Sequence, residues 1–167
     1  MDRTITGVII NDKYKWQHFF VNRSFCAGDN LYVKVVFQVD KLVNEDINTI
    51  KMGLGITDQP INQDRLSYNC PLGYYDKKKG YDSYLTQSYV YLADGRLMVN
   101  KKVSNLITPW KEYDRITFEI HGCYFNIYTN GLPQQTLHLL PERRYSIFGS
   151  LISEQAITLL KVKILIL

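Results

Sequence analysis

Apolar residues recur at every second position over two neighbouring stretches near the middle of the C-terminal half. The two series are Ile116, Phe118 and Ile120, followed by Cys123, Phe125 and Ile127. A period of two is that of a half-buried strand. His121 and Gly122 stand between the series, where a tight turn joins antiparallel strands, and Asn130-Gly131 tolerates the positive φ that ends the second strand. Residues 113–131 therefore predict a hairpin at the centre of a β-sandwich.

Other stretches carry the same period or are rich in β-branched and aromatic residues, which favour strands. The predicted strands cover residues 5–10, 16–21, 31–39, 50–57, 88–92, 96–100, 135–139, 145–148 and 156–166. Residues 23–29 are predicted as a turn, and residues 101–111 as a connection. Turns recur about every ten residues, as in a two-sheet antiparallel sandwich. We predict an all-β fold in which residues 1–167 form a single domain.

Two stretches depart from the simple pattern of half-buried strands. Gly53 and Gly55 lie inside a predicted strand, which indicates a bend or the close approach of a neighbouring backbone. The run from Val162 to Leu167 is unusually apolar for the end of a sequence. It predicts either a buried last strand or a docking segment.

The least regular part of the chain covers residues 61–87. It combines Pro71 and the run Lys77-Lys78-Lys79 with five tyrosines, at positions 68, 74, 75, 81 and 84. Long connections without periodicity are usually functional or disordered. Tyrosine joins a rigid apolar ring to a polar tip, and lysines attract an acidic partner. We therefore expect the loop from Arg65 to Tyr84 to contact a partner; the alternative is a solvated loop whose tyrosines partly pack back on the sheet.

Composition, charge and the absence of known motifs argue against several other classes of function. The chain is 46% apolar and 22% charged, as in ordinary soluble domains, and its net charge of +4 permits an acidic partner without requiring one. No Gly-x-Ser-x-Gly sequence, phosphate-binding glycine loop or zinc motif is present, so no enzymatic activity is expected. The three histidines, at positions 18, 121 and 138, have no carboxylate or cysteine at ligand spacing, so neither a metal nor a cofactor is predicted.

The cysteines indicate where the protein resides. Cys26, Cys70 and Cys123 are an odd set without metal-ligand spacing, and Cys123 fits an inward strand position. The first residues lack the basic-then-apolar pattern of a signal peptide, and no apolar run reaches membrane-spanning length. We expect an intracellular protein of the cytoplasm or nucleus, with no membrane partner.

The order of short motifs resembles the SPRY (B30.2) superfamily, and within it the Neuralized homology repeat, from about Phe20 to Ile164. The matching segments are residues 23–29, 52–57 with Pro60, 88–90, 113–116, 125–131 and 145–149. The segment Phe125-Asn126-Ile127-Tyr128-Thr129-Asn130-Gly131, for example, is similar to the family's Phe-x-Val-Asn-Gly. Tyr113 stands where the family has glycine before Asp114. The resemblance implies a bent two-sheet antiparallel sandwich of the concanavalin A-like jelly-roll type.

The resemblance also implies a non-catalytic module that binds proteins or peptides through loops at one edge, as an adaptor, a substrate receptor of a ubiquitin ligase or a scaffold in a larger assembly. The edge loops that match this surface contain Asp58, Gln59, Pro60, Arg96, Gly149 and Ser150. Together with the irregular loop they form the predicted contact set. From that loop it takes Tyr68, Tyr74, Tyr75, Lys77, Lys78 and Tyr81.

Two other functions stay open at this point. Lysines interleaved with tyrosines suit single-stranded nucleic acid, on which aromatic rings stack bases and lysines follow phosphates. The basic residues are spread along the chain among acidic ones, which argues against this function. A lectin-type sandwich that binds carbohydrate shares the same architecture, and only the two tryptophans and the expected intracellular location argue against it.

Overall fold

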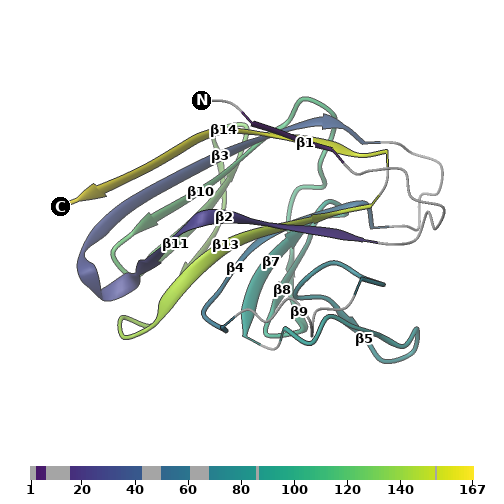
Figure 1. Ribbon diagram of the computed structural model, residues 1–167, viewed down its shortest axis with the longest axis horizontal. Coiled ribbons are helices and arrows are strands. Elements are labelled where there is room, and N and C mark those ends of the chain that lie inside the picture. Colours follow the sequence, from purple (N-terminus) through teal and green to yellow (C-terminus); the bar gives the residue numbers. More distant parts are fainter. Residues whose placement is uncertain (1–2, 7–15, 43–49, 61–67, 86, 153) are drawn as a thin grey trace.

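A computed structural model describes residues 3–6, 16–42, 50–60, 68–85, 87–152 and 154–167. The described elements are β1 (Arg3–Thr6), β2 (Gln17–Cys26), the 3-10 turn η1 (Ala27–Asp29), β3 (Leu31–Lys41), β4 (Met52–Thr57), β5 (Tyr75–Asp76), β6 (Tyr81–Asp82), β7 (Ser88–Leu92), β8 (Arg96–Val99), β9 (Lys102–Leu106), β10 (Arg115–His121), β11 (Tyr124–Thr129), β12 (Leu132–His138), β13 (Arg144–Leu151) and β14 (Ala156–Ile166). These strands confirm the all-β, two-sheet antiparallel sandwich (Figure 1).

Two six-stranded sheets form the sandwich. Sheet A has the order β1-β14-β3-β10-β11-β12, and sheet B has the order β2-β13-β4-β7-β8-β9. In Figure 1, sheet A runs along the upper part and sheet B crosses below it. On one side, β12 is hydrogen-bonded to the edge strand β9 and to the residues that follow it: Asn105 donates to Gln135 at 3.0 Å, and the hydroxyl of Thr108, just after β9, donates to Gln134 at 2.8 Å. The sheets are therefore joined at that side of the sandwich.

The core between the sheets forms because inward side chains alternate on each strand. Phe118 on β10 packs edge-to-face against Phe37 of β3 and Phe125 of β11, with ring centroids 6.3 and 5.0 Å apart. From sheet B, Leu54 and Tyr91 face this cluster, and all five side chains are buried. Such edge-to-face aromatic pairs stabilise a core beyond the burial of their area.

A third layer covers the outer face of sheet B. We call residues 68–85 the Tyr–Lys segment. Buried residues of the segment pack on residues of β7, β8 and β13 that point away from the main core. The cluster comprises Cys70, Leu72, Tyr74 and Leu85 from the segment, and Val90, Leu92, Met98 and Phe148 from the sheet. The described part of the irregular loop is thus an ordered layer that holds the two short strands β5 and β6.

The central hairpin is confirmed, with one shift. β10 and β11 pair in the register Phe118 with Ile127 and Ile120 with Phe125, and β10 also pairs with β3. The turn lies at Gly122 and Cys123 and not at His121 and Gly122, because β10 continues through His121. Cys123 is therefore a half-buried turn residue and not an inward strand residue.

Two other local predictions are wrong. Residues 23–26 belong to β2, in which residues 24–26 pair with residues 144–146 of β13, and only Ala27–Asp29 form a turn. Residues 102–106 form strand β9, paired with β8, where a connection was expected. Every residue of β9 is exposed, so the strand lacks the alternation that reveals a half-buried one. Of the predicted strand 5–10, residues 7–10 lie outside the described residues.

The last predicted strand, residues 156–166, is confirmed as β14, but its apolar end is not buried. Val162, Leu165, Ile166 and Leu167 are all exposed, and 85% of the surface of Ile166 is accessible to solvent.

Trp110 is a core residue that packs edge-to-face on Tyr91, with ring centroids 5.2 Å apart. The three cysteines are free thiols. Within the described ranges, no helix is long and apolar enough to cross a bilayer.

Candidate partner-binding face

The β5–β6 hairpin is the most exposed part of the Tyr–Lys segment. A four-residue turn, residues 77–80, joins Tyr75–Asp76 to Tyr81–Asp82, and its three lysines are exposed. Asp76 caps the turn: its Oδ1 accepts the backbone N–H groups of Lys78 at 3.0 Å and Lys79 at 3.2 Å. Gly80 has φ +70°, which glycine adopts without strain. The turn therefore presents three ammonium groups from a fixed backbone.

The Asp76 cap predicts a pH dependence of this turn. The N–H of Lys79, then that of Lys78, holds the pKa of the Asp76 carboxyl below its ordinary value of about 3.9. A carboxyl with a lowered folded pKa stabilises the structure above its unfolded pKa, and this contribution is lost as pH falls through the folded pKa. An NMR titration should show the amide shifts of Lys78 and Lys79 changing only below pH about 3.9. In Asp76→Ala this step should vanish; a step at higher pH in the wild type would contradict the cap.

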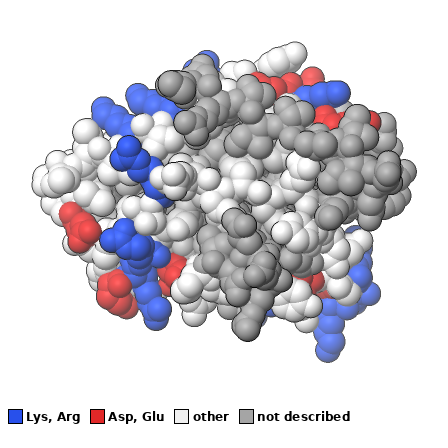
Figure 2. Space-filling view, viewed as in Figure 1, with Lys and Arg blue, Asp and Glu red and all other residues white. Residues whose placement is uncertain are grey.

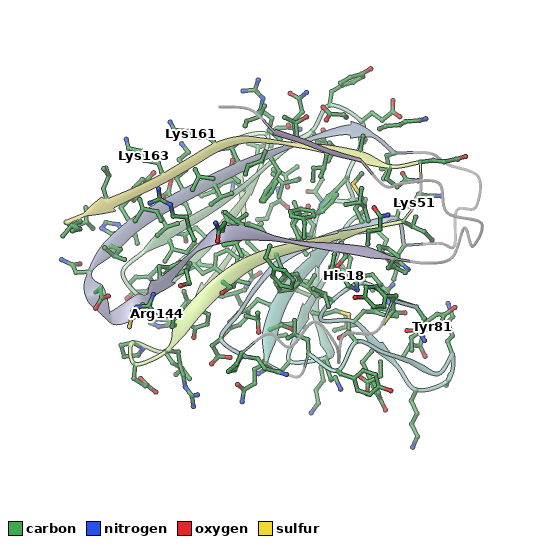
Figure 3. The ribbon with its side chains drawn as sticks, viewed as in Figure 1. His18, Lys51, Tyr81, Arg144, Lys161 and Lys163 are labelled. Carbon is green, nitrogen blue, oxygen red and sulfur yellow. The ribbon has the colours of Figure 1, made fainter. Side chains whose placement is uncertain are left out.

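Four tyrosines of the segment present their rings to solvent: Tyr68, Tyr75, Tyr81 and Tyr84. Tyr81 lies on the hairpin at the lower right of Figure 3. Tyr74 is buried, with its hydroxyl 3.4 Å from Asp76 Oδ2. Burial raises the pKa of Tyr74, against the opposing effect of the nearby Arg96. The segment thus buries one tyrosine as an anchor and exposes the others.

Cations from β8 and its turn brace the hairpin from the side of the sheet. The Arg96 guanidinium lies 5.2 Å from the centroid of the Tyr74 ring, and Lys101 Nζ lies 5.1 Å from that of Tyr75. Lys101 Nζ is also 2.8 Å from Asp82 Oδ1. Arg96 is held in turn by Asp94, with an N–O distance of 2.8 Å. These contacts combine cation–π attraction with ion pairing and fix the orientation of the hairpin.

The start of the segment is anchored to buried groups of sheet B. The Leu72 N–H donates to Ser150 Oγ at 3.0 Å, and His18 Nδ1 lies 2.8 Å from the same oxygen. The His18 ring in turn stacks on Tyr68, with centroids 5.4 Å apart. Gly73 donates to Ser83 Oγ at 3.0 Å within the segment. One buried hydroxyl, on Ser150, therefore joins β2, β13 and the Tyr–Lys segment.

Replacing Ser150 by alanine is expected to lower the free energy of unfolding by about 1–3 kcal/mol, because the buried N–H of Leu72 loses its acceptor. Urea denaturation measures this loss, and hydrogen exchange of residues 70–74 should become faster. Ser104→Ala on the exposed strand β9 is the control and should change stability by less than about 0.5 kcal/mol. Unchanged exchange in Ser150→Ala would show that the hydroxyl does not hold the segment.

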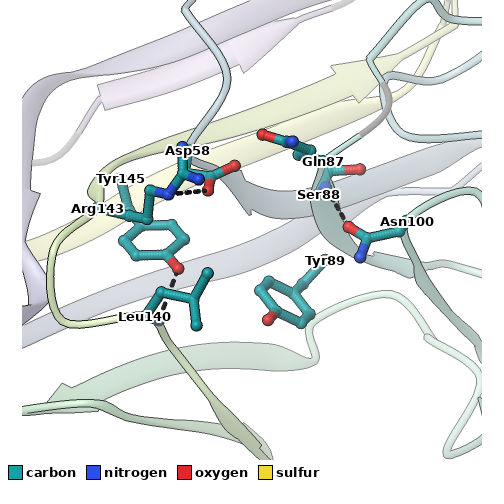
Figure 4. A pocket seen from close by; sticks show the side chains of 8 residues that line it. All are labelled: Asp58, Gln87, Ser88, Tyr89, Asn100, Leu140, Arg143 and Tyr145. Carbon is teal, nitrogen blue, oxygen red and sulfur yellow. Dashed lines mark hydrogen bonds and ion pairs between the residues drawn. The ribbon is translucent and has the colours of Figure 1, made fainter.

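A small pocket opens beside the segment, where β4, β7, β8 and β13 begin or end (Figure 4). Its volume is about 130 Å³, and it is lined by Asp58, Gln87, Ser88, Tyr89, Asn100, Leu140, Arg143 and Tyr145. Asp58 Oδ2 lies 3.8 Å from Arg143 Nε, and Tyr145 Oη accepts the Leu140 N–H at 2.9 Å. Burial raises the pKa of Tyr89 and of Tyr145, so both hydroxyls stay neutral near pH 7. The pocket can accept one side chain by hydrogen bonding.

Gln59 joins this pocket to the Tyr–Lys segment. Its side-chain amide donates to the carbonyl of Tyr84 at 3.2 Å, and its oxygen accepts the N–H of Gln87 at 3.3 Å. Pro60 follows as an exposed residue. Tyr84 itself is 61% exposed and has φ +61°. The turn after β4 and the segment are therefore joined by hydrogen bonds. Together they are the candidate surface for contact with a partner, which we call the partner-binding face.

The structure brings most of the predicted contact residues to this face. Those that lie on it are Asp58, Gln59, Pro60, Tyr68, Tyr75, Lys77, Lys78 and Tyr81, with Tyr74 and Arg96 as supports beneath. Gly149 and Ser150 are not in an edge loop, because they lie inside β13 and are buried. Ser150 supports the segment from below. A Cβ on Gly149 would come within 2.2 Å of the Phe19 ring, so this glycine makes room in the core.

Several residues of the face could not be found from the sequence. Lys101 and His18 brace the segment, Lys101 in part through Asp82, while Arg143 and Tyr145 line the pocket. No motif marks any of these four residues, because the segment and the pocket bring together elements from different parts of the chain. Among the described residues, no three His, Cys, Asp or Glu side chains gather as metal ligands would.

Comparison with known proteins supports the fold. No protein-family model and no curated protein sequence matches the chain. Among solved structures, the SPRY domain of human HERC1 is 12% identical, with a TM-score of 0.56 over 87% of this chain and 82% of that one. The TRIM65 PSpry domain is 14% identical, with a TM-score of 0.58 over 86% of this chain and 69% of that one. The metal-free Emp46p carbohydrate recognition domain is 5% identical, with a TM-score of 0.56 over 91% of this chain and 78% of that one.

At these identities the likeness concerns the fold. The chain has the two-sheet sandwich that SPRY domains and this carbohydrate recognition domain share. The resemblance to the SPRY superfamily is therefore supported as a likeness of architecture. Closer similarity to the Neuralized homology repeat stays a prediction.

Proposed function

We propose that this protein is a non-catalytic protein-interaction module, and that the partner-binding face grips an acidic protein or peptide. The observation that carries the proposal is an exposed set of tyrosines and lysines on a backbone held from beneath. Tyr75, Tyr81 and Tyr84 are exposed, while Leu72 and Tyr74 of the same segment are buried against the outer face of sheet B. Binding residues are often carried by loops that a rigid scaffold holds in position, and tyrosine rings offer large apolar contacts with a polar tip.

The physical chemistry of the face suits protein binding. Tyrosine supplies a large contact area at low entropic cost, and tyrosines are common among the residues that dominate interface energies. The backbone of the hairpin is already ordered by Asp76 and Ser150, so less entropy is lost on binding. The lysines of the turn attract carboxylates and increase the rate of association. The neighbouring pocket at Asp58 and Arg143 can receive a single polar or aromatic side chain of the same partner.

The fold suggests the setting in which such binding occurs. HERC1 and TRIM65 each contain a SPRY domain of this architecture. We propose that the present chain acts within an assembly, as an adaptor, a substrate receptor or a subunit, inside the cell. The three free cysteines agree with a reducing compartment.

A comparison of two double variants tests the proposal. Wild type, Tyr75→Ala/Tyr81→Ala and Tyr113→Ala/Tyr124→Ala are used as baits under native conditions, and the affinity of each recovered protein is then measured with purified components. Tyr113 and Tyr124 are also exposed but lie outside the partner-binding face. Loss of Tyr75 and Tyr81 should lower the affinity for a true partner at least tenfold, since each residue that dominates an interface contributes about 1–2 kcal/mol or more to binding. The control variant should bind like the wild type.

Two parallel assays examine the rival functions. A single-stranded oligonucleotide that binds with an affinity falling steeply with salt, and that is lost in Tyr75→Ala/Tyr81→Ala, would favour nucleic-acid binding. Specific retention on a glycan array would favour the carbohydrate binding that the Emp46p domain's name describes. Equal recovery of every partner by both double variants would contradict the proposed use of this face.

A further inference from the structure

The C-terminal half of β14 is an unpaired edge of sheet A within the described part of the chain. β1 pairs with residues 156–159 of β14, whereas residues 161–166 pair on the other side with β3. No described segment pairs with residues 161–166 on their outer side. Exposed strand edges present backbone donors and acceptors that can pair with another chain. This edge belongs to sheet A, whereas the partner-binding face lies on sheet B.

The direction of each backbone group on this edge follows from the ladder. The Leu167 N–H donates to the Asn30 carbonyl, and alternate residues of a strand hydrogen-bond to opposite neighbours. Lys161, Lys163 and Leu165 therefore bond toward β3. The N–H and C=O groups of Val162, Ile164 and Ile166 point toward the open edge. The free backbone N–H and C=O groups of these three residues, two positions apart along the strand, are the donors and acceptors with which an added strand would pair.

The two faces of this edge differ: the inner face carries aliphatic side chains alone, and the outer face carries two lysines and the exposed Leu165. Val162, Ile164 and Ile166 pair with Val35, Val33 and Leu31, whose side chains point to the inside of the sandwich, yet Val162 and Ile166 are exposed. Val162 and Ile166 thus leave apolar surface uncovered on the inner face, on either side of Ile164, which is half-buried and packs on the main core. Lys161 and Lys163 occupy the outer face and project from β14 at the upper left of Figure 3. Lys and Arg side chains gather in the corresponding region of Figure 2.

Pairing with a second copy of this chain is opposed by the two lysines. Consider two β14 strands that pair antiparallel about a two-fold axis. If the axis passes through Lys163, this residue lies opposite Lys163 of the second copy. If it passes through Val162, Lys161 of each copy lies opposite Lys163 of the other. An axis at Ile164 brings the two copies of Lys163 to adjacent diagonal positions. Like charges directly opposite each other destabilise a ladder. Lysines on an edge are also a common protection against such self-pairing.

We propose that β14 is a second docking site, which takes an extended segment of another protein as an added strand of sheet A. The complementary segment alternates aliphatic residues, opposite Val162, Ile164 and Ile166, with carboxylates opposite Lys161 and Lys163. The aliphatic side chains cover the exposed apolar surface, and the carboxylates replace lysine repulsion with cross-strand ion pairs. An acidic, alternating β-segment is therefore the class of ligand that fits the edge.

Synthetic peptides test the site on the purified protein. In antiparallel register, Val-Thr-Ile-Glu-Val-Glu places glutamate opposite Lys163 and Lys161; a scrambled peptide and Val-Thr-Ile-Lys-Val-Lys are the controls. NMR titration into the millimolar range should show binding of the glutamate peptide, with slowed exchange of the amides of Val162, Ile164 and Ile166. Lys161→Glu/Lys163→Glu should bind it at least about tenfold more weakly and should now prefer the lysine peptide.

Two proline variants separate pairing from general disruption. Val162→Pro removes an N–H that points to the open edge, so it should abolish peptide binding while the fold is kept. Lys163→Pro removes an N–H that bonds to β3 and should instead lower stability. Tyr75→Ala/Tyr81→Ala should bind the peptide normally, which separates this site from the partner-binding face. Absence of binding by the wild type, or equal binding by Val162→Pro, would overturn the proposal; a dimer abolished by Val162→Pro would assign the edge to a second copy.

Discussion

Replacing Phe118 by alanine is expected to lower the free energy of unfolding by about 3–5 kcal/mol, the cost of a large cavity in a packed core. Phe118 is fully buried at the centre of sheet A and contacts the rings of Phe37 and Phe125 edge-to-face. Its loss removes both aromatic contacts and the surface that faces sheet B. Because domains of this size are stable by about 5–15 kcal/mol, this loss is a large fraction of the total stability.

Urea denaturation, followed by the intrinsic fluorescence of Trp16 and Trp110, measures this effect. Thr117→Ala is the matched control, since Thr117 is the next residue of β10 and points to the outer face of the sheet. Its substitution should cost less than about 1 kcal/mol. A loss below about 1 kcal/mol for Phe118→Ala would show that the two sheets do not meet at this residue.

Replacing Gly55 by alanine is expected to lower the free energy of unfolding by about 3 kcal/mol, the cost of overpacking a site with no free space. A Cβ at this position would lie 2.3 Å from the Tyr89 carbonyl oxygen and 2.5 Å from the Phe148 ring. The backbone of β7 cannot withdraw without breaking its ladder with β4. Strand β4 would have to shift, and with it the surface on which the Tyr–Lys segment packs.

Gly53→Ala on the same strand is the control for Gly55→Ala. Its nearest contacts would be methyl groups of Leu92 and Val90 at 3.1 and 3.3 Å, which can move by a few tenths of an ångström. This variant should cost about 1 kcal/mol or less. Thermal unfolding of the two variants measures the difference. Equal losses would contradict the close backbone approach that distinguishes Gly55.

The strands predicted best from the sequence are those whose two faces differ. Residues 31–39 and 116–127 alternate because one face meets sheet B and the other meets solvent, and both stretches form the expected strands. Gly55 also behaves as predicted, since it permits the close approach of Tyr89. In each case the signal is local: it is carried by consecutive residues and does not depend on what lies across the sheet.

The elements that were missed depend on contacts between distant residues. β9 is exposed along its whole length, so only its pairing with β8 makes it a strand. The apolar run from Val162 to Leu167 suggests burial, yet Val162, Leu165, Ile166 and Leu167 are exposed, which depends on what the rest of the fold packs against them. The buried position of Gly149 and Ser150 follows from β13 lying between β2 and β4. None of these neighbours can be read from the local pattern.

The exposed residues of the partner-binding face could be predicted from the sequence, but the contacts that hold them in place could not. Its tyrosines and lysines are concentrated in one stretch of sequence, so their exposure on a common surface could be anticipated. What holds them there could not. The anchors His18 and Ser150 are separated by 132 residues, and Ser150 lies 78 residues from Leu72. Such contacts cannot be predicted from composition or spacing, although they decide whether the segment is a solvated loop or an ordered layer on the sheet.

Hydrogen–deuterium exchange of the purified protein, with and without a partner recovered by the wild-type bait, tests whether the Tyr–Lys segment is an ordered surface that binds a partner. We expect residues 70–74 to exchange slowly in the free protein, and binding to protect residues 75–84 together with the turn at 58–60. Fast exchange throughout 68–85 in the free protein, or protection confined to residues outside the partner-binding face, would contradict this expectation.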